Sequence, residues 1–203
     1  MRLMRSHIAL TVSLLTIGCG APMPLSPRMS FFVTSTGLGD GGNLGGIAGA
    51  DAHCQQLAAS VGSARTWHAY LSTPGPPPVN ARERIGAGPW FNAAGTQIAA
   101  NVEQLHRDGH LLTRDTLLTE EGERVPSLTH DMLTGSTDNG YLVPSATCQA
   151  WASNGPGGAR VGHADRRAGA EESWNSAHTT SGCSAKALHT ALGAGLFYCF
   201  AID

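Results

Sequence analysis

The chain has 203 residues, of which 26 are glycine and 14% are charged, and its formal net charge is −2. Without Arg2 and Arg5, which belong to a predicted export signal, 11 basic residues stand against 15 acidic ones. This mildly acidic balance argues against a nucleic-acid partner. The length suffices for one domain with a core, and the abundant glycine indicates many loops and tight turns.

Residues 1–18 have the pattern of a bacterial export signal. Arg2 and Arg5 precede the apolar stretch HIALTVSLLTIG, which is too short to span a bilayer, since a spanning helix needs about twenty residues. The stretch ends in LLTIGC, which resembles a lipobox, so Cys19 is expected to become the lipid-modified N-terminus after cleavage. An ordinary signal peptide in which Cys19 is incidental is the alternative.

The segment that follows predicts how the protein is attached to the membrane. Residues 19–29 are rich in proline and lack apolar periodicity, so we expect a lipidated cysteine and a flexible tether. Gly20, by analogy with other lipoproteins, is compatible with sorting to the outer membrane. We therefore expect an exported cell-envelope protein, periplasmic or surface-exposed, that contacts the membrane only through its lipid anchor and carries one domain, residues 30–203.

The pattern along this domain predicts an α+β fold. Residues 48–62 have apolar side chains at Cys54, Leu57, Ala58 and Val61, the spacing of an amphipathic helix. This is the one substantial helix that we expect. Short strands are expected within residues 29–36, 66–72, 89–100 (two strands and a turn), 146–153 and 195–202, with a loop-rich insertion at 153–182.

Four cysteines remain in the domain, and an even number in an exported protein indicates two disulfides. The spacing alone leaves three connectivities open. No pair forms C-x-x-C, so a cysteine zinc site or a thioredoxin-like motif has no support. The four residues are Cys54, Cys148, Cys183 and Cys199.

Several segments carry a family resemblance that covers most of residues 30–203. The runs FFVTSTGLGDGGNLGGIAGADAHCQQLA, VNARERIGAGPWFNAAGTQIA, HDMLTGS, TCQAWAS, SWNSAH and GLFYCFA resemble endostatin-like bacterial lipoproteins. More distantly, the layout is similar to the C-type-lectin-like fold. The resemblance implies one main helix on short, mostly antiparallel strands, and nested disulfides that pair Cys54 with Cys199 and Cys148 with Cys183. The bacterial family is largely uncharacterised, so the resemblance supplies no function.

The ending that begins with Trp174-Asn175 resembles the Trp-Asn-Asp ending of sugar-binding C-type lectins, where Asn and Asp hold calcium. Ser176 stands where the Asp would be, and no upstream partner motif is found, so calcium is the less expected metal. The favoured interpretation is that Trp174 packs in the core and Asn175 hydrogen-bonds loop backbone.

Five histidine and aspartate residues could hold a transition metal such as zinc if the fold brings them together. The simpler interpretation is that the histidines hydrogen-bond loop backbone. A second pair, His106 and His110, is a weaker metal candidate because Gly109 indicates a turn between them. The candidate ligands are His130, Asp131, His163, Asp165 and His178.

The sequence contains no G-x-S-x-G or H-E-x-x-H motif, so no catalytic residue and no definite cofactor is predicted. We expect a lectin-like protein that binds a glycan or an extracellular protein through the 153–182 region. The alternatives are a metal-dependent hydrolase or metal-binding protein built on the histidine–aspartate set, and a structural envelope component. Candidate ligand-binding residues are His163, Asp165, Trp174, Asn175 and His178.

Overall fold

The computed structural model describes residues 24–107, 109–164 and 173–203. The predicted signal, residues 1–18, and the predicted lipidation site, Cys19, lie outside these ranges. Within them, no helix is both long and apolar enough to cross a membrane. The fold is mixed α+β, with one long helix, many short strands and two disulfides, in agreement with the sequence pattern.

The longest helix, α1, spans Gly46–Ser60, close to the predicted range. Short helices follow: the 3₁₀ turn η1 (Ala81–Glu83), α2 (Val102–Leu105), α3 (Cys148–Trp151) and α4 (Ala185–Thr190). The strands are β1 (Phe31–Val33), β2 (Trp67–Ala69), β3 (Trp90–Phe91), β4 (Gln97–Ala99), β5 (Asp131–Leu133), β6 (Arg160–His163), β7 (His178–Thr179) and β8 (Gly193–Ala201).

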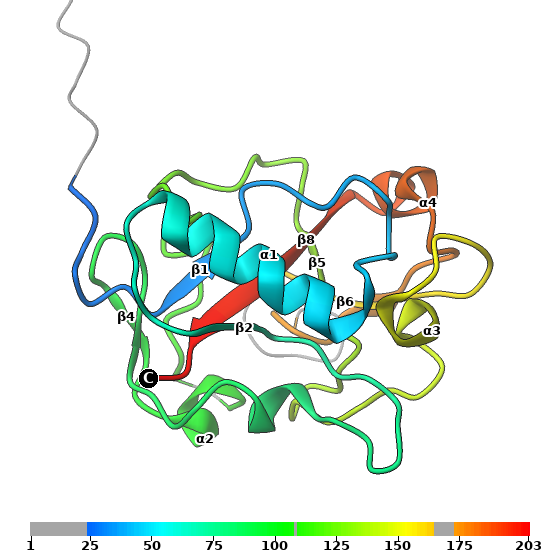
Figure 1. Ribbon diagram of the computed structural model, residues 1–203, viewed down its shortest axis with the longest axis horizontal. Coiled ribbons are helices and arrows are strands. Elements are labelled where there is room, and N and C mark those ends of the chain that lie inside the picture. Colours follow the sequence, from blue (N-terminus) through cyan, green and yellow to red (C-terminus); the bar gives the residue numbers. More distant parts are fainter. Residues whose placement is uncertain (1–23, 108, 165–172) are drawn as a thin grey trace, which may run out of the picture.

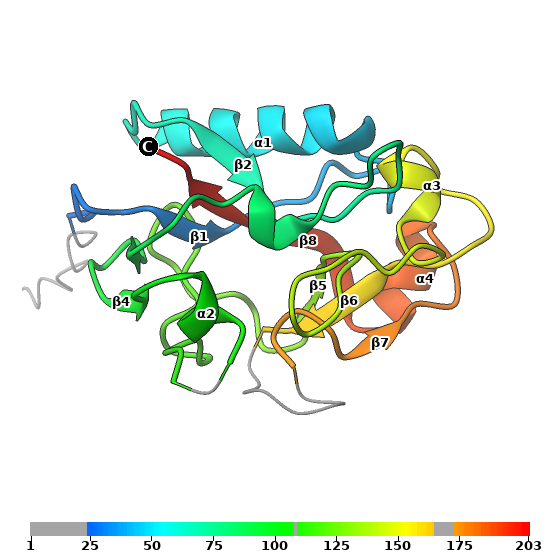
Figure 2. The same ribbon diagram turned by 90° about the horizontal axis from the view of Figure 1, so that it is seen from below.

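The main sheet has the order β1-β8-β5-β6-β7, with β2 also paired to β8. All of its pairs are antiparallel except β5 with β8. The long last strand β8 therefore lies at the centre, and α1 crosses one face beside β2 (Figures 1 and 2). Strands β3 and β4 form a separate antiparallel pair, at the predicted turn.

Strand β8 separates two apolar cores, which explains its nearly continuous hydrophobic sequence. Phe197 and Cys199 belong to the core that contains α1, whereas Tyr198 and Phe200 belong to a second, aromatic core. All four side chains are fully buried. Burying a side chain of this kind stabilises the fold by about 1.5–3 kcal/mol relative to leaving it exposed.

The two disulfides confirm the nested pairing that the resemblance implied. Cys54 of α1 bonds Cys199 of β8, with 5.7 Å between their Cα atoms, and ties the helix to the central strand. Cys148 of α3 bonds Cys183, with a Cα separation of 5.6 Å, and closes the 153–182 region.

The strand expected within residues 146–153 is wrong, because this segment forms the turn α3. Residues 148–151 all have φ between 47° and 64°, the left-handed region. Non-local contacts hold this conformation: Trp151 donates its indole N–H to the Ser72 carbonyl at 2.8 Å, and Cys148 is disulfide-bonded. These contacts outweigh the local alternation of apolar residues that indicated a strand.

Of the tether predicted over residues 19–29, the structure describes residues 24–29, and these pack against the domain. Met29 is 5% exposed, and Leu25 packs against the core. The backbone N–H of Ser26 donates to the Ala93 carbonyl at 2.8 Å. Residues 24–29 are therefore attached to the domain surface next to the β3–β4 turn.

Candidate metal centre

Strands β5, β6 and β7, with His130 directly before β5, bring four of the five predicted ligands together around Asp131. Antiparallel pairing puts His163 of β6 opposite Asp131 of β5. On the other side of β6, His178 of β7 stands opposite Val161, two residues from His163. Positions two apart share a face of the sheet, so all three side chains project from the same face (Figure 2 shows the three strands).

Two local features make this approach possible. A β-bulge in the pairing of β5 with β8 falls between Asp131 and Met132, and bulges re-aim the side chains beside them. On β6, a Cβ added at Gly162 would lie 1.9 Å from the Trp174 carbonyl oxygen. Only glycine therefore lets the segment at residues 173–178 cross β6 closely enough to bring His178 to the cluster.

The carboxylate of Asp131 is the centre of the cluster. Its Oδ1 lies 3.4 Å from Nε2 of His130 and 3.4 Å from Nε2 of His163, and its Oδ2 lies 3.2 Å from Nε2 of His178. The side chain of Asp131 is 1% exposed, whereas that of His178 is 43% exposed. The cluster thus has a buried carboxylate and one imidazole open to solvent.

The imidazole rings are packed against one another. His130 and His163 stack with centroids 4.5 Å apart and planes 9° from parallel, and His163 meets His178 edge-on at 5.1 Å. The three rings and the carboxylate thus place nitrogen and oxygen donors, the ligand atoms that a transition metal takes, close to one another.

The ligand atoms of His130, Asp131 and His163 lie within 4.8 Å of one another, close enough to share one metal ion. His178 is outside this group and is joined to it by its contact with Asp131. Zinc binds nitrogen and oxygen at about 2.0–2.2 Å, which puts neighbouring ligands of a tetrahedron roughly 3.4 Å apart. The distances from Asp131 to the three rings agree with this value and are longer than most N–H···O hydrogen bonds. The fifth predicted ligand, Asp165, lies outside the described residues.

The structure places Trp174 and Asn175 in the interior, as the favoured interpretation expected. Trp174 is 1% exposed and donates its indole N–H to the Leu105 carbonyl. The Asn175 amide donates to the backbone carbonyls of Thr137 and Asp138, and its Oδ1 accepts from Ser173. Because both side chains are buried, neither contacts a ligand at the surface, and their assignment as ligand-binding residues is corrected.

Asn175 belongs to a buried polar network that sequence reasoning did not anticipate. It donates to the hydroxyl of Tyr70 at 2.8 Å, and that hydroxyl lies 2.7 Å from Nε2 of His106. Burial raises the pKa of Tyr70 and lowers the pKa of His106 to about 4. The other ring nitrogen of His106 contacts the Val102 carbonyl. His106 is therefore a neutral core residue, consistent with the weaker metal prediction for this pair.

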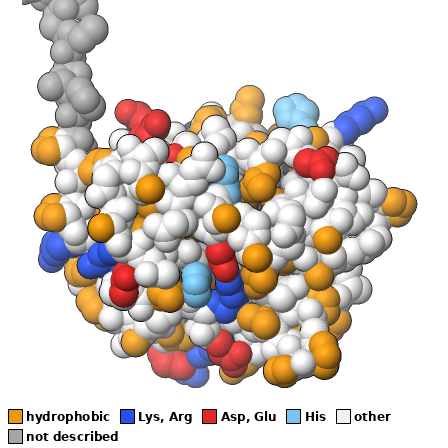
Figure 3. All heavy atoms as spheres, viewed as in Figure 1, with side chains coloured by type: hydrophobic (Ala, Val, Ile, Leu, Met, Phe, Trp, Pro, Cys, Tyr) orange, Lys and Arg blue, Asp and Glu red, His pale blue; other side chains and the backbone are white. Residues whose placement is uncertain are grey.

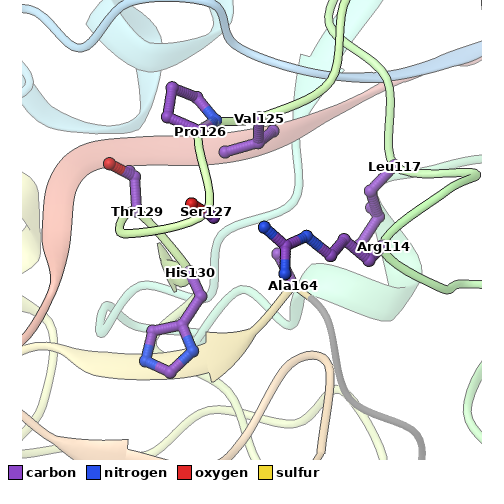
Figure 4. Close-up of a pocket in the computed structure, with 8 residues that line it drawn as sticks. All are labelled: Arg114, Leu117, Val125, Pro126, Ser127, Thr129, His130 and Ala164. Atoms are coloured by element: carbon purple, nitrogen blue, oxygen red, sulfur yellow. The ribbon is translucent and has the colours of Figure 1, made fainter.

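A small pocket adjoins the cluster and shares His130 with it (Figure 4). Sequence reasoning missed this pocket, because its residues come from separate loops and carry no common motif. On the face shown in Figure 3, acidic and basic side chains are interspersed, as the small net charge suggests. The pocket is lined by Arg114, Leu117, Val125, Pro126, Ser127, Thr129, His130 and Ala164.

No family model matches the chain, and no curated protein matches it.

Proposed function

We propose that the protein binds a transition-metal ion, with zinc the best fit, through His130, Asp131, His163 and His178. The single observation that carries this proposal is the convergence of three imidazole Nε2 atoms on one buried carboxylate, at 3.2–3.4 Å. These residues lie up to 48 positions apart in sequence (His130 to His178), so the fold itself assembles the set.

The donor atoms of the four side chains indicate which metal would bind. Imidazole nitrogens with one carboxylate suit zinc and its first-row neighbours, whereas calcium takes six to eight oxygen ligands. The Asn175 side chain, which the lectin resemblance offered for calcium, is buried and hydrogen-bonded elsewhere. Zinc is therefore favoured over calcium.

His178 is the most exposed of the four proposed ligands, so the proposed ion is accessible to solvent on that side. A ligand that is 43% exposed lies on the solvent side of the ion, where an incoming oxygen can reach the metal or replace the histidine. The 153–182 region, expected from the sequence to bind a partner, supplies both His163 and His178. We therefore propose that the 153–182 region binds its ligand at the metal ion, as a lectin-like protein whose binding depends on the metal.

The proposed setting is the cell envelope, with a lipid anchor at Cys19. Two disulfides support export, because such bonds persist in oxidising compartments. The disulfide from the main helix to the last strand, with a second bridge nested inside it, supports the proposal that the domain is endostatin-like and C-type-lectin-like. Because a fold does not by itself determine function, the proposed function rests on the histidine–aspartate cluster.

A metal-dependent hydrolase is the second candidate, because the solvent side of the proposed ion is also where a bound water would lie. Zinc-dependent turnover of ester or glycoside substrates by the purified protein, lost in Asp131→Asn, would favour the hydrolase. Ligand binding without turnover favours the binding protein.

The direct test measures zinc in the full protein, purified in detergent from envelopes of the producing cells. We expect one zinc per chain and at least a hundredfold loss of affinity in His163→Ala. His189→Ala, which removes an exposed histidine on α4, is the matched control and keeps wild-type affinity. Equal affinities in all three proteins, or no zinc bound at micromolar concentrations, would exclude the site.

A further inference from the structure

The turn that joins α4 to β8 lies directly against β5, the strand of the metal centre that begins at Asp131. Helix α4 ends at Thr190 and β8 begins at Gly193 (Figure 1). Between them, the carbonyl oxygen of Leu192 accepts a hydrogen bond from the backbone N–H of His130 at 3.0 Å and from that of Asp131 at 3.3 Å. One oxygen atom therefore holds the backbone of two consecutive proposed ligands.

Leu192 has an unfavourable backbone conformation. Its φ is 61°, in the left-handed region, and among the described residues other than glycine only the four of α3 share this feature. A left-handed residue often ends a helix, but it is usually glycine, because any Cβ makes this conformation unfavourable. The leucine side chain is 46% exposed, so its burial compensates only in part. Contacts of the turn with its surroundings are therefore needed to hold the conformation.

The glycine stands one position later, where the turn comes closest to the buried carboxylate. Gly193 is paired with Asp131 in the sheet, beside the bulge. A Cβ added at Gly193 would lie 3.2 Å from the Cβ of Asp131 and 3.2 Å from the carbonyl oxygen of Leu188. Gly193 does not have a positive φ, so this close approach is the reason for glycine here.

We propose that Leu192 and Gly193 position His130 and Asp131 for the metal ion. Neither has a side-chain atom that could bind the ion, so both act through the two ligands. The Leu192 carbonyl fixes the backbone of His130 and Asp131 at the bulge, and Gly193 leaves the space in which the Asp131 side chain turns toward the histidine rings. This inference rests on the proposed metal function and assigns positioning residues to that site.

The first test alters the left-handed conformation in the full protein. In Leu192→Val the β-branched side chain disfavours this conformation further, so we expect about a tenfold loss of zinc affinity, as for other residues that orient metal ligands. Leu192→Gly adopts the conformation freely and should keep wild-type affinity. Leu111→Val is the matched control, because Leu111 is similarly exposed (49%) and is not left-handed.

A spectroscopic measurement separates positioning from a general loss of stability. Cobalt(II) bound in place of zinc has a visible absorption spectrum that depends on its coordination geometry. This spectrum should change in Leu192→Val and keep its wild-type form in Leu192→Gly. An unchanged spectrum and zinc affinity in Leu192→Val, or an equal loss of affinity in Leu192→Gly, would overturn the role of the left-handed turn.

The second test fills the space at Gly193. Gly193→Ala should lower the zinc affinity by about tenfold and change the cobalt spectrum, because the added methyl group displaces Asp131. Gly75→Ala is the control, since its Cβ would also lie 3.2 Å from a carbonyl oxygen, that of Pro77, and would touch no proposed ligand. Wild-type affinity in Gly193→Ala would overturn the role of this glycine.

Hydrogen exchange in the metal-free protein makes the test independent of the proposed metal function. The amides of His130 and Asp131 should exchange about tenfold faster in Leu192→Val than in the wild type, whereas the Tyr70 amide, which donates to the Tyr198 carbonyl, should not change. Absence of zinc binding by the wild type would contradict the proposed function. Unchanged exchange of the two amides in Leu192→Val would contradict positioning by the turn.

Discussion

The carboxylate of Asp131 and the imidazole of His178 meet at 3.2 Å, although one side chain is 1% exposed and the other 43%. Strand β6 lies between the strands that carry them. The cluster therefore extends from the buried face of the sheet to the solvent. A metal ion bound between these two side chains would have one buried ligand and one exposed ligand. If the two side chains bind zinc, substitutions at Asp131 should change the zinc affinity.

Asp131→Asn should abolish tight zinc binding. The amide keeps the shape of the side chain but removes the negative charge that compensates the ion, so we expect at least a hundredfold loss of affinity. Competition with a chromophoric chelator measures it. Asp138→Asn, which changes an exposed carboxylate, should bind zinc as the wild type does, and a similar loss there would point to nonspecific charge effects.

Asn175→Ala should destabilise the fold by about 2–4 kcal/mol, because it leaves several buried partners of the amide unsatisfied. Urea unfolding of the metal-free protein measures the change. Asn139→Ala, at an exposed position, should stay within about 0.5 kcal/mol of the wild type. A change below 1 kcal/mol in Asn175→Ala would show that the network is not a major source of stability.

Gln149→Gly should stabilise the protein by roughly 1 kcal/mol, because Gln149 is exposed and has φ of 55°. The left-handed conformation costs a residue with a Cβ about 1–2 kcal/mol. Glycine removes this cost, but its greater freedom in the unfolded chain offsets part of the stabilisation. Ala52→Gly, at an exposed position of α1, should destabilise by about 1 kcal/mol. Thermal unfolding of the two variants should therefore shift in opposite directions.

Removing either disulfide as a pair of Cys→Ala substitutions should destabilise the protein by about 2–5 kcal/mol. The loop closed by Cys54–Cys199 spans 145 residues and that closed by Cys148–Cys183 spans 35. The loop-entropy model then makes loss of the outer bridge about 1 kcal/mol more costly. Denaturant unfolding of the two double variants tests the order, and the reverse order would show that chain entropy does not dominate.

Acid should destabilise the protein in part through His106. The pKa of His106 is lowered by burial to about 4, below its value of 6.5 in an unfolded chain. The unfolded state therefore binds more protons than the folded state below pH 6.5, and stability falls as the pH drops from about 6.5 toward 4. In His106→Gln this part of the loss should disappear, whereas His189→Gln should follow the wild type. Identical pH profiles for all three metal-free proteins would contradict the assignment.

The sequence predicted those features that depend on short-range pattern. Helical spacing around Cys54 and Leu57 indicated α1, and the apolar run at residues 195–202 indicated the central strand. The disulfide pairing came from the family resemblance, since spacing alone left three connectivities. The left-handed turn at Cys148–Trp151 was not predicted, because contacts with distant residues such as Ser72 hold it.

The residues of the candidate metal site were named from the sequence, as an alternative to histidines that hydrogen-bond loop backbone, but their geometry was not predicted. The assembly of the site depends on the register of β5 with β6, a bulge beside Asp131 and the close crossing at Gly162, none of which has a local sequence signal.

Diffraction from zinc-soaked crystals of the protein, recorded at the zinc absorption edge, tests the central claim most directly. The proposal predicts one anomalous peak at about 2.0–2.2 Å from Nε2 of His163 and from a carboxylate oxygen of Asp131. The peak should be missing in His163→Ala crystals that retain the fold. Wild-type crystals without density at this position, or with zinc bound only at exposed histidines such as His189, would contradict it.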